Sequence, residues 1–165
     1  MLRRMKISVL TLDPETKTPI VVLKDPETET FLHMSIGIAE ATAIATELEG
    51  IRFTRPMTHD LLKNLTIKFG IRVIGVEVCD LRDRTFYAWI YLSVNGKRTR
   101  VDSRPSDALA LALRTNAPIY VNERVFEKLE RGRRAAEAAI EDRHADKWTE
   151  ILENMSPEDF GKYKM

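Results

Sequence analysis

Two Arg-Pro segments of this sequence bring together residue types that can bind and cleave a phosphate ester. Arg55-Pro56-Met57-Thr58-His59-Asp60 and Arg104-Pro105-Ser106-Asp107 each place an arginine, a hydroxyl and an acid at a predicted helix start. Backbone N–H groups at a helix start are free, and a guanidinium binds phosphate oxygens in pairs, so both segments suit an anion. Asp60 and Asp107 would compete for those donors unless a divalent cation bridges carboxylate and phosphate.

The second segment is the richer in candidate ligands. Asp102, Arg104 and Asp107 fall within six residues at a predicted strand-to-helix junction, a place where functional sites often form. Two carboxylates and one guanidinium predict a site for Mg²⁺ or Mn²⁺ with a bound phosphate, with Asp102 and Asp107 as metal ligands. Glu40, near the start of the first predicted helix, is a third candidate ligand, although acids are common in a first helical turn because they stabilise the helix dipole.

The first segment supplies a candidate base. His59 is of the type that titrates near neutral pH and can take a proton from an attacking water. We therefore predict His59, Asp60, Asp102 and Asp107 as catalytic residues and Arg55, Arg104 and Ser106 as substrate-binding residues. The alternative is that the hydroxyls and acids only cap their helices and that the histidine hydrogen-bonds a neighbour.

An aromatic stripe is a further candidate for binding. Tyr87, Trp89 and Tyr91 alternate along one predicted strand, and Arg98 and Arg100 lie on the next. Aromatic side chains beside arginines can stack bases and hold a nucleic-acid backbone. The same stripe is also typical of a sheet face that packs under helices or against another subunit, which we favour here.

The elements that position these residues predict an α+β fold, with a mixed, largely antiparallel sheet meander, packed helices and a C-terminal helical tail. An Asn95-Gly96 pair marks a tight hairpin within the meander. We predict strands over residues 5–12, 19–25, 30–36, 72–81, 85–94, 97–102 and 118–121. We predict helices over residues 38–50, 57–69, 105–114 and 122–154, with a possible break at Gly132 and a new helix cap at 156–159.

The amino-acid composition excludes some classes of protein. The 165 residues are 44% hydrophobic and 31% charged with a net charge of +1, which excludes a disordered chain and predicts that any basic site is local. No apolar run approaches the ~20 residues that span a bilayer, and the single Cys79 fits a reducing compartment, so we expect a cytoplasmic protein of bacterial type without membrane contact. A charge shift near residue 121 predicts a body over 1–122 and a helical extension over 123–165.

Several segments resemble the bifunctional nuclease domain family, once catalogued as a domain of unknown function. The resemblance spans roughly residues 5–122 and is strongest in the last segment. The segments that carry it are Pro19-Ile20-Val21-Val22-Leu23, Ile36-Gly37 with Glu40-Ala41 and Ala43-Ile44-Ala45, Arg55 to Leu62, Thr85-Phe86-Tyr87-Ala88, and Asp102 to Ala112. The resemblance implies an α+β domain, a homo-oligomer and activity on both DNA and RNA.

Two functional hypotheses follow. The first is a metal-assisted nuclease that hydrolyses phosphodiester bonds of DNA and RNA, and it requires the ionised groups between Asp102 and Asp107 to face solvent. The second is a non-enzymatic oligomeric module that binds a small anionic ligand or a partner protein, with the Arg-Pro-Asp clusters as caps and ion pairs. The near-neutral net charge favours the second slightly, because nucleases without sequence preference profit from basic surfaces.

Overall fold

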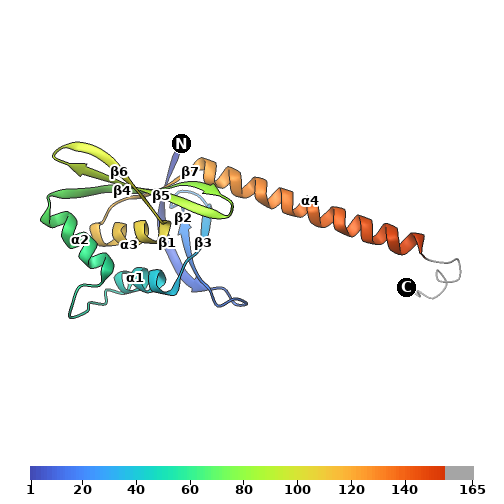
Figure 1. Cartoon of the computed structure of the whole chain (residues 1–165), viewed down its shortest axis with the longest axis horizontal. Coiled ribbons are helices and arrows are strands. Elements are labelled where there is room, and N and C mark those ends of the chain that lie inside the picture. Colours follow the sequence, from blue (N-terminus) through green and yellow to red (C-terminus); the bar gives the residue numbers. More distant parts are fainter. Residues whose placement is uncertain (155–165) are drawn as a thin grey trace. The chain divides into compact units, whose positions relative to one another are not determined.

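The chain folds into a seven-stranded sheet and four helices in the computed structural model, which describes residues 1–154. The strand order is β3-β2-β1-β7-β4-β5-β6 (Figure 1). Neighbouring strands are antiparallel except for the parallel pair of β4 and β7. The strands are β1 (Leu2–Leu12), β2 (Pro19–Lys24), β3 (Phe31–Ser35), β4 (Ile71–Arg82), β5 (Thr85–Val94), β6 (Lys97–Ser103) and β7 (Ile119–Asn122). The predicted α+β class is confirmed, whereas the predicted cap at 156–159 lies outside the described residues.

Three helices pack on one face of this sheet. They are α1 (Ile38–Leu48), α2 (Thr58–Lys68) and α3 (Pro105–Thr115), and α3 lies between the other two and against β4 and β5 (Figure 1). The alternating Leu and Ala residues of α3 are strong helix formers, and Pro105 suits its first turn. Because α3 is the central helix, its N-terminus lies where residues from α1 and α2 can reach it.

The hydrophobic core lies between α3 and the sheet. Ala88 and Ile90 of β5 are buried together with Leu109 and Leu111 of α3. Side chains alternate between the faces of a strand, so the intervening Trp89 lies on the opposite face of β5, where it is half-exposed. The sheet therefore has a helix-covered face and an outer face.

The predicted hairpin between β5 and β6 is confirmed. Asn95 and Gly96 both have positive φ, 50° and 78°, as a two-residue turn of the tight hairpin type requires. The turn fixes the register, with Val94 opposite Lys97 and Trp89 opposite Asp102. Every residue of β6 is thereby assigned to a face.

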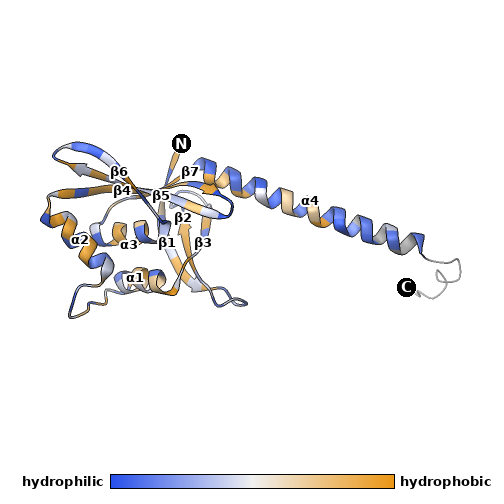
Figure 2. Ribbon diagram, in the orientation of Figure 1, coloured by the Kyte–Doolittle hydropathy of each residue, from blue (hydrophilic) through white to orange (hydrophobic). Residues whose placement is uncertain are grey.

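The last helix, α4 (Glu123–Glu153), is continuous, so the predicted break at Gly132 is wrong. Side-chain ion pairs bridge this position, because Arg133 contacts Glu137 and both Arg133 and Arg134 contact Glu130. The chain divides into one compact unit over Met1–Phe126 and a second that begins at Glu127. The described residues of α4 are mostly hydrophilic (Figure 2).

Among the helices of residues 1–154, none is both long and apolar enough to cross a bilayer.

Candidate functional site

His59 and Asp107 form a hydrogen-bonded pair at the start of two neighbouring helices. His59 Nε2 lies 2.9 Å from Asp107 Oδ1, which joins the first turn of α2 to the first turn of α3. The His59 and Asp107 side chains are 13% and 28% exposed. Because the Asp107 carboxylate accepts a hydrogen bond from Nε2, Nδ1 of the neutral ring carries the lone pair. Within residues 1–154, Nδ1 has no hydrogen-bond partner.

Arg104 extends this pair into a network of four charged or titratable groups. Its Nε donates to Asp107 Oδ2 at 2.8 Å, and its Nη1 lies 2.8 Å from Glu40 Oε1. A guanidinium has five N–H donors, and the Arg104 side chain is 65% exposed, so the rest of its N–H groups face solvent. Glu40 reaches Arg104 across Gly37, where a side chain would collide with the Glu40 carboxylate.

The hydrogen bonds of this network keep the Asp107 carboxylate ionised. Burial alone would raise the pKa of Asp107, but hydrogen bonds from Arg104 and His59 outweigh it and hold the pKa below its usual value. The same Asp107 carboxylate raises the pKa of the Arg104 guanidinium. Asp107 and Arg104 are therefore an ion pair at neutral pH.

Asp60 has a different partner from its neighbour His59. Its Oδ1 accepts a hydrogen bond from Arg114 Nε at 2.7 Å, and its Oδ2 accepts one from the Met57 N–H at 3.0 Å. These hydrogen bonds, that from Arg114 foremost, lower the pKa of Asp60. Asp60 thus caps α2 and fastens it to α3 through a buried arginine, and the structure does not bring its carboxylate into the His59–Asp107 pair.

Asp102 lies on the other face of the sheet. Directly opposite residues share a face of an antiparallel pair, and Asp102 is opposite Trp89 on the outer face. Asp107 follows on α3, which packs on the helix-covered face. The short separation of Asp102 and Asp107 in sequence therefore does not bring their carboxylates to one site.

The predicted ligand set does not fit a divalent cation. Both oxygens of Asp107 already have partners, and the Arg104 guanidinium lies between Asp107 and Glu40, where its charge repels a cation. Of the residues that the structure describes, no three His, Cys, Asp or Glu side chains are grouped to hold a metal ion. Of the ionised groups at this junction, Asp102 and Arg104 face solvent, whereas Asp107 is 28% exposed and is bonded to His59 and Arg104.

A pocket of about 280 Å³ adjoins this network at the N-terminus of α3. Arg84, Arg104 and the buried Ser106 line it together with Glu40 and the apolar Phe86. Two guanidiniums and a helix start are suited to an anionic group. Two predicted substrate-binding residues, Arg104 and Ser106, are therefore at one pocket, while Arg55 is exposed in the segment before α2.

Sequence reasoning missed Arg84 and Arg114. Arg84 lies in the turn between β4 and β5 with a positive φ of 62°, and only the fold brings it beside Arg104. Arg114 is in the last turn of α3 and reaches Asp60 on α2. No local motif marks either residue, but a polar residue in a run of Leu and Ala indicates that Arg114 needs a partner if it is buried.

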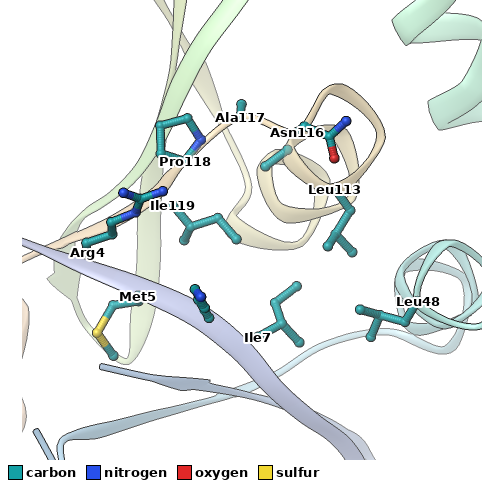
Figure 3. A pocket seen from close by; sticks show the side chains of 11 residues that line it. Arg4, Met5, Ile7, Leu48, Leu113, Asn116, Ala117, Pro118 and Ile119 are labelled. Atoms are coloured by element: carbon teal, nitrogen blue, oxygen red, sulfur yellow. The ribbon is translucent and has the colours of Figure 1, made fainter. Parts of the chain in front are cut away.

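Another pocket, of about 330 Å³, has a different lining (Figure 3). Ile7 of β1, Leu48 at the end of α1, Leu113 of α3 and Ile119 of β7 surround it. Arg4 lies at its side, and no acid lines it. This lining contains the cations Arg4 and Lys6 but no carboxylate, histidine or cysteine.

The architecture is that of an α+β domain with a His–Asp pair that Arg104 links to an arginine-lined pocket. The family model of the bifunctional nuclease domain matches residues 21–132, which is more than half of the chain. The chain therefore belongs to the bifunctional nuclease domain family, as its motifs indicated.

Similar proteins come from bacteria and plants. An uncharacterized protein of Mycobacterium tuberculosis is 36% identical over 147 residues, which are 86% of this chain and 88% of that protein. Bifunctional nuclease 1 of Oryza sativa subsp. japonica is 30% identical over 110 residues, 65% of this chain. Bifunctional nuclease 2 of Arabidopsis thaliana is 31% identical over 108 residues, 64% of this chain. Both plant matches cover 29% of the plant protein, so the plant chains are much longer than the shared domain.

Proposed function

We propose that this chain is a nuclease that hydrolyses phosphodiester bonds of DNA and RNA at the His59–Asp107 pair. The observation that carries the proposal is the 2.9 Å contact between His59 Nε2 and Asp107 Oδ1, in a member of a nuclease domain family. A base oriented by a carboxylate is a recurring device for activating a nucleophile. Here the nucleophile is a water molecule.

In this proposal His59 removes a proton from water through Nδ1 while the water attacks phosphorus. Asp107 holds the imidazole in the tautomer that leaves Nδ1 unprotonated, and its negative charge stabilises the imidazolium that forms. The proton then passes from Nδ1 to the leaving oxygen or to solvent. The lowered pKa of Asp107 keeps its carboxylate ionised throughout.

The scissile phosphate is proposed to bind in the pocket beside Arg104. Arg84 and the free N–H groups of Arg104 would contact its oxygens, Ser106 lies at the same wall, and Arg55 would contact a neighbouring phosphate. Glu40 opposes this, because its carboxylate already occupies Arg104 Nη1. Phosphate must therefore bind to the outward-facing N–H groups or displace Glu40.

Divalent-metal assistance by Mg²⁺ or Mn²⁺ stays a proposal that rests on the substrate chemistry. The arrangement of Glu40, Asp102 and Asp107 does not support it, and no step above passes through a metal ion. A metal-dependent nuclease loses activity in EDTA, whereas the His59 step as proposed does not need a cation.

The test is cleavage of supercoiled plasmid and of labelled single-stranded RNA by the purified full chain, with and without EDTA. His59→Ala should lower the cleavage rate by about 100-fold or more, the usual contribution of an acid–base group. His33→Ala is the matched control, because His33 is an exposed histidine on β3. Equal rates in His59→Ala and the unaltered chain would assign the cleavage to a contaminant or another site.

A homo-oligomer is proposed on a separate observation, the exposure of α2. This helix has no buried residue, and its sequence includes hydrophobic residues (Figure 2). Leu61 and Leu65 of the helix and Phe69 just after it are 53%, 46% and 72% exposed. Phe53 and Met57 before the helix are each 50% exposed. An apolar surface of this extent is typical of an interface.

We infer that two copies of the chain cover this α2 surface. Sedimentation should give a mass of at least twice 19.0 kDa, and Leu65→Asp should reduce it to that of one chain. Arg131→Glu, a change at an exposed side chain of α4, is the control and should leave the mass unchanged. A monomer in the unaltered chain would overturn the proposal, and it would also remove support for the alternative oligomeric module.

A further inference from the structure

The outer face of the sheet holds a groove of about 630 Å³ that is remote from the helix-covered face. Its lining includes Tyr91 of β5, Tyr120 of β7, and Arg98 and Arg100 of β6. The volume lies within the range of about 300–1,000 Å³ that is typical of small-ligand sites. The groove is thus large enough to take a nucleotide.

Two tyrosines and a glycine shape the groove. Gly75 of β4 is directly opposite Tyr91 in the strand register. A Cβ placed on Gly75 would lie 3.6 Å from Tyr120 Cε2, so any larger side chain at this position would extend into the space beside that ring. That Cβ would lie nearest to Pro118 O, at 3.5 Å, and the β4–β5 register is irregular between Val73 and Gly75, so the glycine suits a strand irregularity and the close approach of the Pro118 backbone.

The Tyr91 hydroxyl is bonded to a buried acid beneath the groove. Tyr91 Oη donates to Glu77 Oε2 at 2.5 Å, and Asn122 donates to Glu77 Oε1 at 3.1 Å. Glu77 is 5% exposed, so this acid is buried beneath the face with both oxygens occupied. Burial foremost, and then the bond to Glu77, raises the pKa of Tyr91, which stays a neutral donor.

Three arginines follow one line along this face. Arg100 is opposite Tyr91, Arg98 is opposite Ser93, and Ser93 is in turn opposite Arg72 of β4, so all three share the outer face. The Arg100 guanidinium lies 4.3 Å from the centre of the Trp89 ring. Across residues 1–154 none of these arginines forms an ion pair. Their charges are available to an anion.

We propose that this groove binds a segment of single-stranded nucleic acid, with bases on the Tyr91 and Tyr120 rings and backbone phosphates on Arg98 and Arg100. The chemistry of the lining selects this occupant: aromatic faces accept any base, and unpaired guanidiniums on the rim match a phosphate backbone. A protein partner with an apolar surface would leave these guanidiniums desolvated without a counter-charge. The inference does not rest on hydrolysis, because the groove and the His59–Asp107 pair lie on opposite faces of the sheet.

The test is the fluorescence anisotropy of a labelled single-stranded oligo-dT of 20 nucleotides, titrated with the full chain at several salt concentrations. A denaturing gel checks that the oligonucleotide stays intact, which separates binding from cleavage. Arg98→Ala with Arg100→Ala should weaken binding at least tenfold and reduce the salt slope by about 1.4, since each phosphate contact on a single strand contributes about 0.7. Gly75→Val should weaken binding with the salt slope unchanged, because it adds volume but removes no charge.

The matched control is Lys68→Ala with Arg131→Ala, which removes two positive charges from α2 and α4 and should change the affinity less than twofold. Thermal melts of each variant establish that it is folded. Equal affinity in the groove variants and the unaltered chain would overturn the proposal, as would an equal loss in the control. A fall in sedimenting mass caused by Gly75→Val without oligonucleotide would also overturn it, because the groove would then be an interface between copies.

Discussion

His59 Nε2 lies 2.9 Å from Asp107 Oδ1, although 48 residues separate the two in the chain. The contact exists because α2 and α3 pack side by side and both residues belong to first helical turns. The network that it joins holds a histidine, two carboxylates and one guanidinium, in which Arg104 contacts both acids. This arrangement orients a base, and it gives each residue of the cluster a distinct expected response to substitution.

Asp107→Asn tests the orienting role of the carboxylate. The amide keeps the size of the side chain but removes the charge that stabilises the imidazolium, and it can present an N–H toward the ring. We expect the cleavage rate to fall at least 100-fold while the KM changes little, since the phosphate-binding arginines remain. Single-turnover kinetics on labelled RNA measure both parameters, and a rise in KM alone would mean that Asp107 acts through Arg104.

Glu40→Gln distinguishes a competitor of phosphate from a metal ligand. Removing the charge frees Arg104 Nη1 from its 2.8 Å ion pair, so the KM for the substrate should fall a few-fold with the rate constant kept. Loss of activity together with loss of a Mg²⁺ requirement would instead identify Glu40 as a ligand.

Gly37→Ala offers a second route to the same result. The backbone of Gly37, at φ −74° and ψ 162°, is one that alanine adopts readily. The new methyl group displaces the Glu40 carboxylate, and the stability cost at this N-cap should stay near about 1 kcal/mol. The KM should therefore shift in the same direction as in Glu40→Gln. If the Glu40–Arg104 contact is broken in Gly37→Ala but the KM is unchanged, the substrate phosphate does not bind to Arg104.

The strands and helices could be predicted from sequence because their signals are local. Alternation marked β5, and Asn95-Gly96 marked the turn to β6. That turn also implied the face of Asp102, since pairing Val94 with Lys97 forces Trp89 opposite Asp102. Because Asp102 and Asp107 are close in sequence, their spacing predicts one site for both, and it does not take account of the strand register, which assigns Asp102 to the outer face.

The partners of the site residues could not be predicted, because they depend on how helices pack. His59 and Asp60 are neighbours in the chain, yet they face Asp107 and Arg114 respectively. Successive residues of a helix point about 100° apart, so adjacency in sequence separates their side chains. Only the packing of α2 against α3 decides which partner each one meets.

Asp60→Ala tests the structural ion pair with Arg114. The Arg114 side chain is 4% exposed and that of Asp60 is 35% exposed. Removing one partner of a buried pair lowers the free energy of unfolding by about 3–5 kcal/mol. Because solvent reaches the partly exposed Asp60 side chain, we expect a loss of about 2–3 kcal/mol here. Urea unfolding measures the change, and Arg114→Met combined with Asp60→Leu should recover part of the loss. A change below about 0.5 kcal/mol would assign no structural role to the pair.

Acid should destabilise the fold through the same carboxylates. The pKa values of Asp60 and Asp107 are lowered in the folded chain, so the unfolded state binds protons more readily at acidic pH. Their contribution to the free energy of unfolding is fully present above the unfolded value of about 3.9, and it is lost as pH falls through the folded values. Unfolding curves between pH 7 and pH 3 should show a smaller decline for Asp60→Asn with Asp107→Asn than for the unaltered chain. Parallel declines would show that other groups control the acid transition.

Asp102→Asn tests whether cleavage and oligonucleotide binding take place on different faces of the sheet. Because Asp102 lies opposite Trp89 on the outer face, the substitution should leave the cleavage rate within about twofold of the unaltered chain. It removes a negative charge from the face that carries Arg98 and Arg100, so oligo-dT should bind more tightly at low salt, and the gain should shrink as added salt screens the charge. Cleavage assays and anisotropy on the same preparation measure both effects. A large loss of cleavage with unchanged oligonucleotide binding would return Asp102 to the catalytic set and contradict the separation by faces.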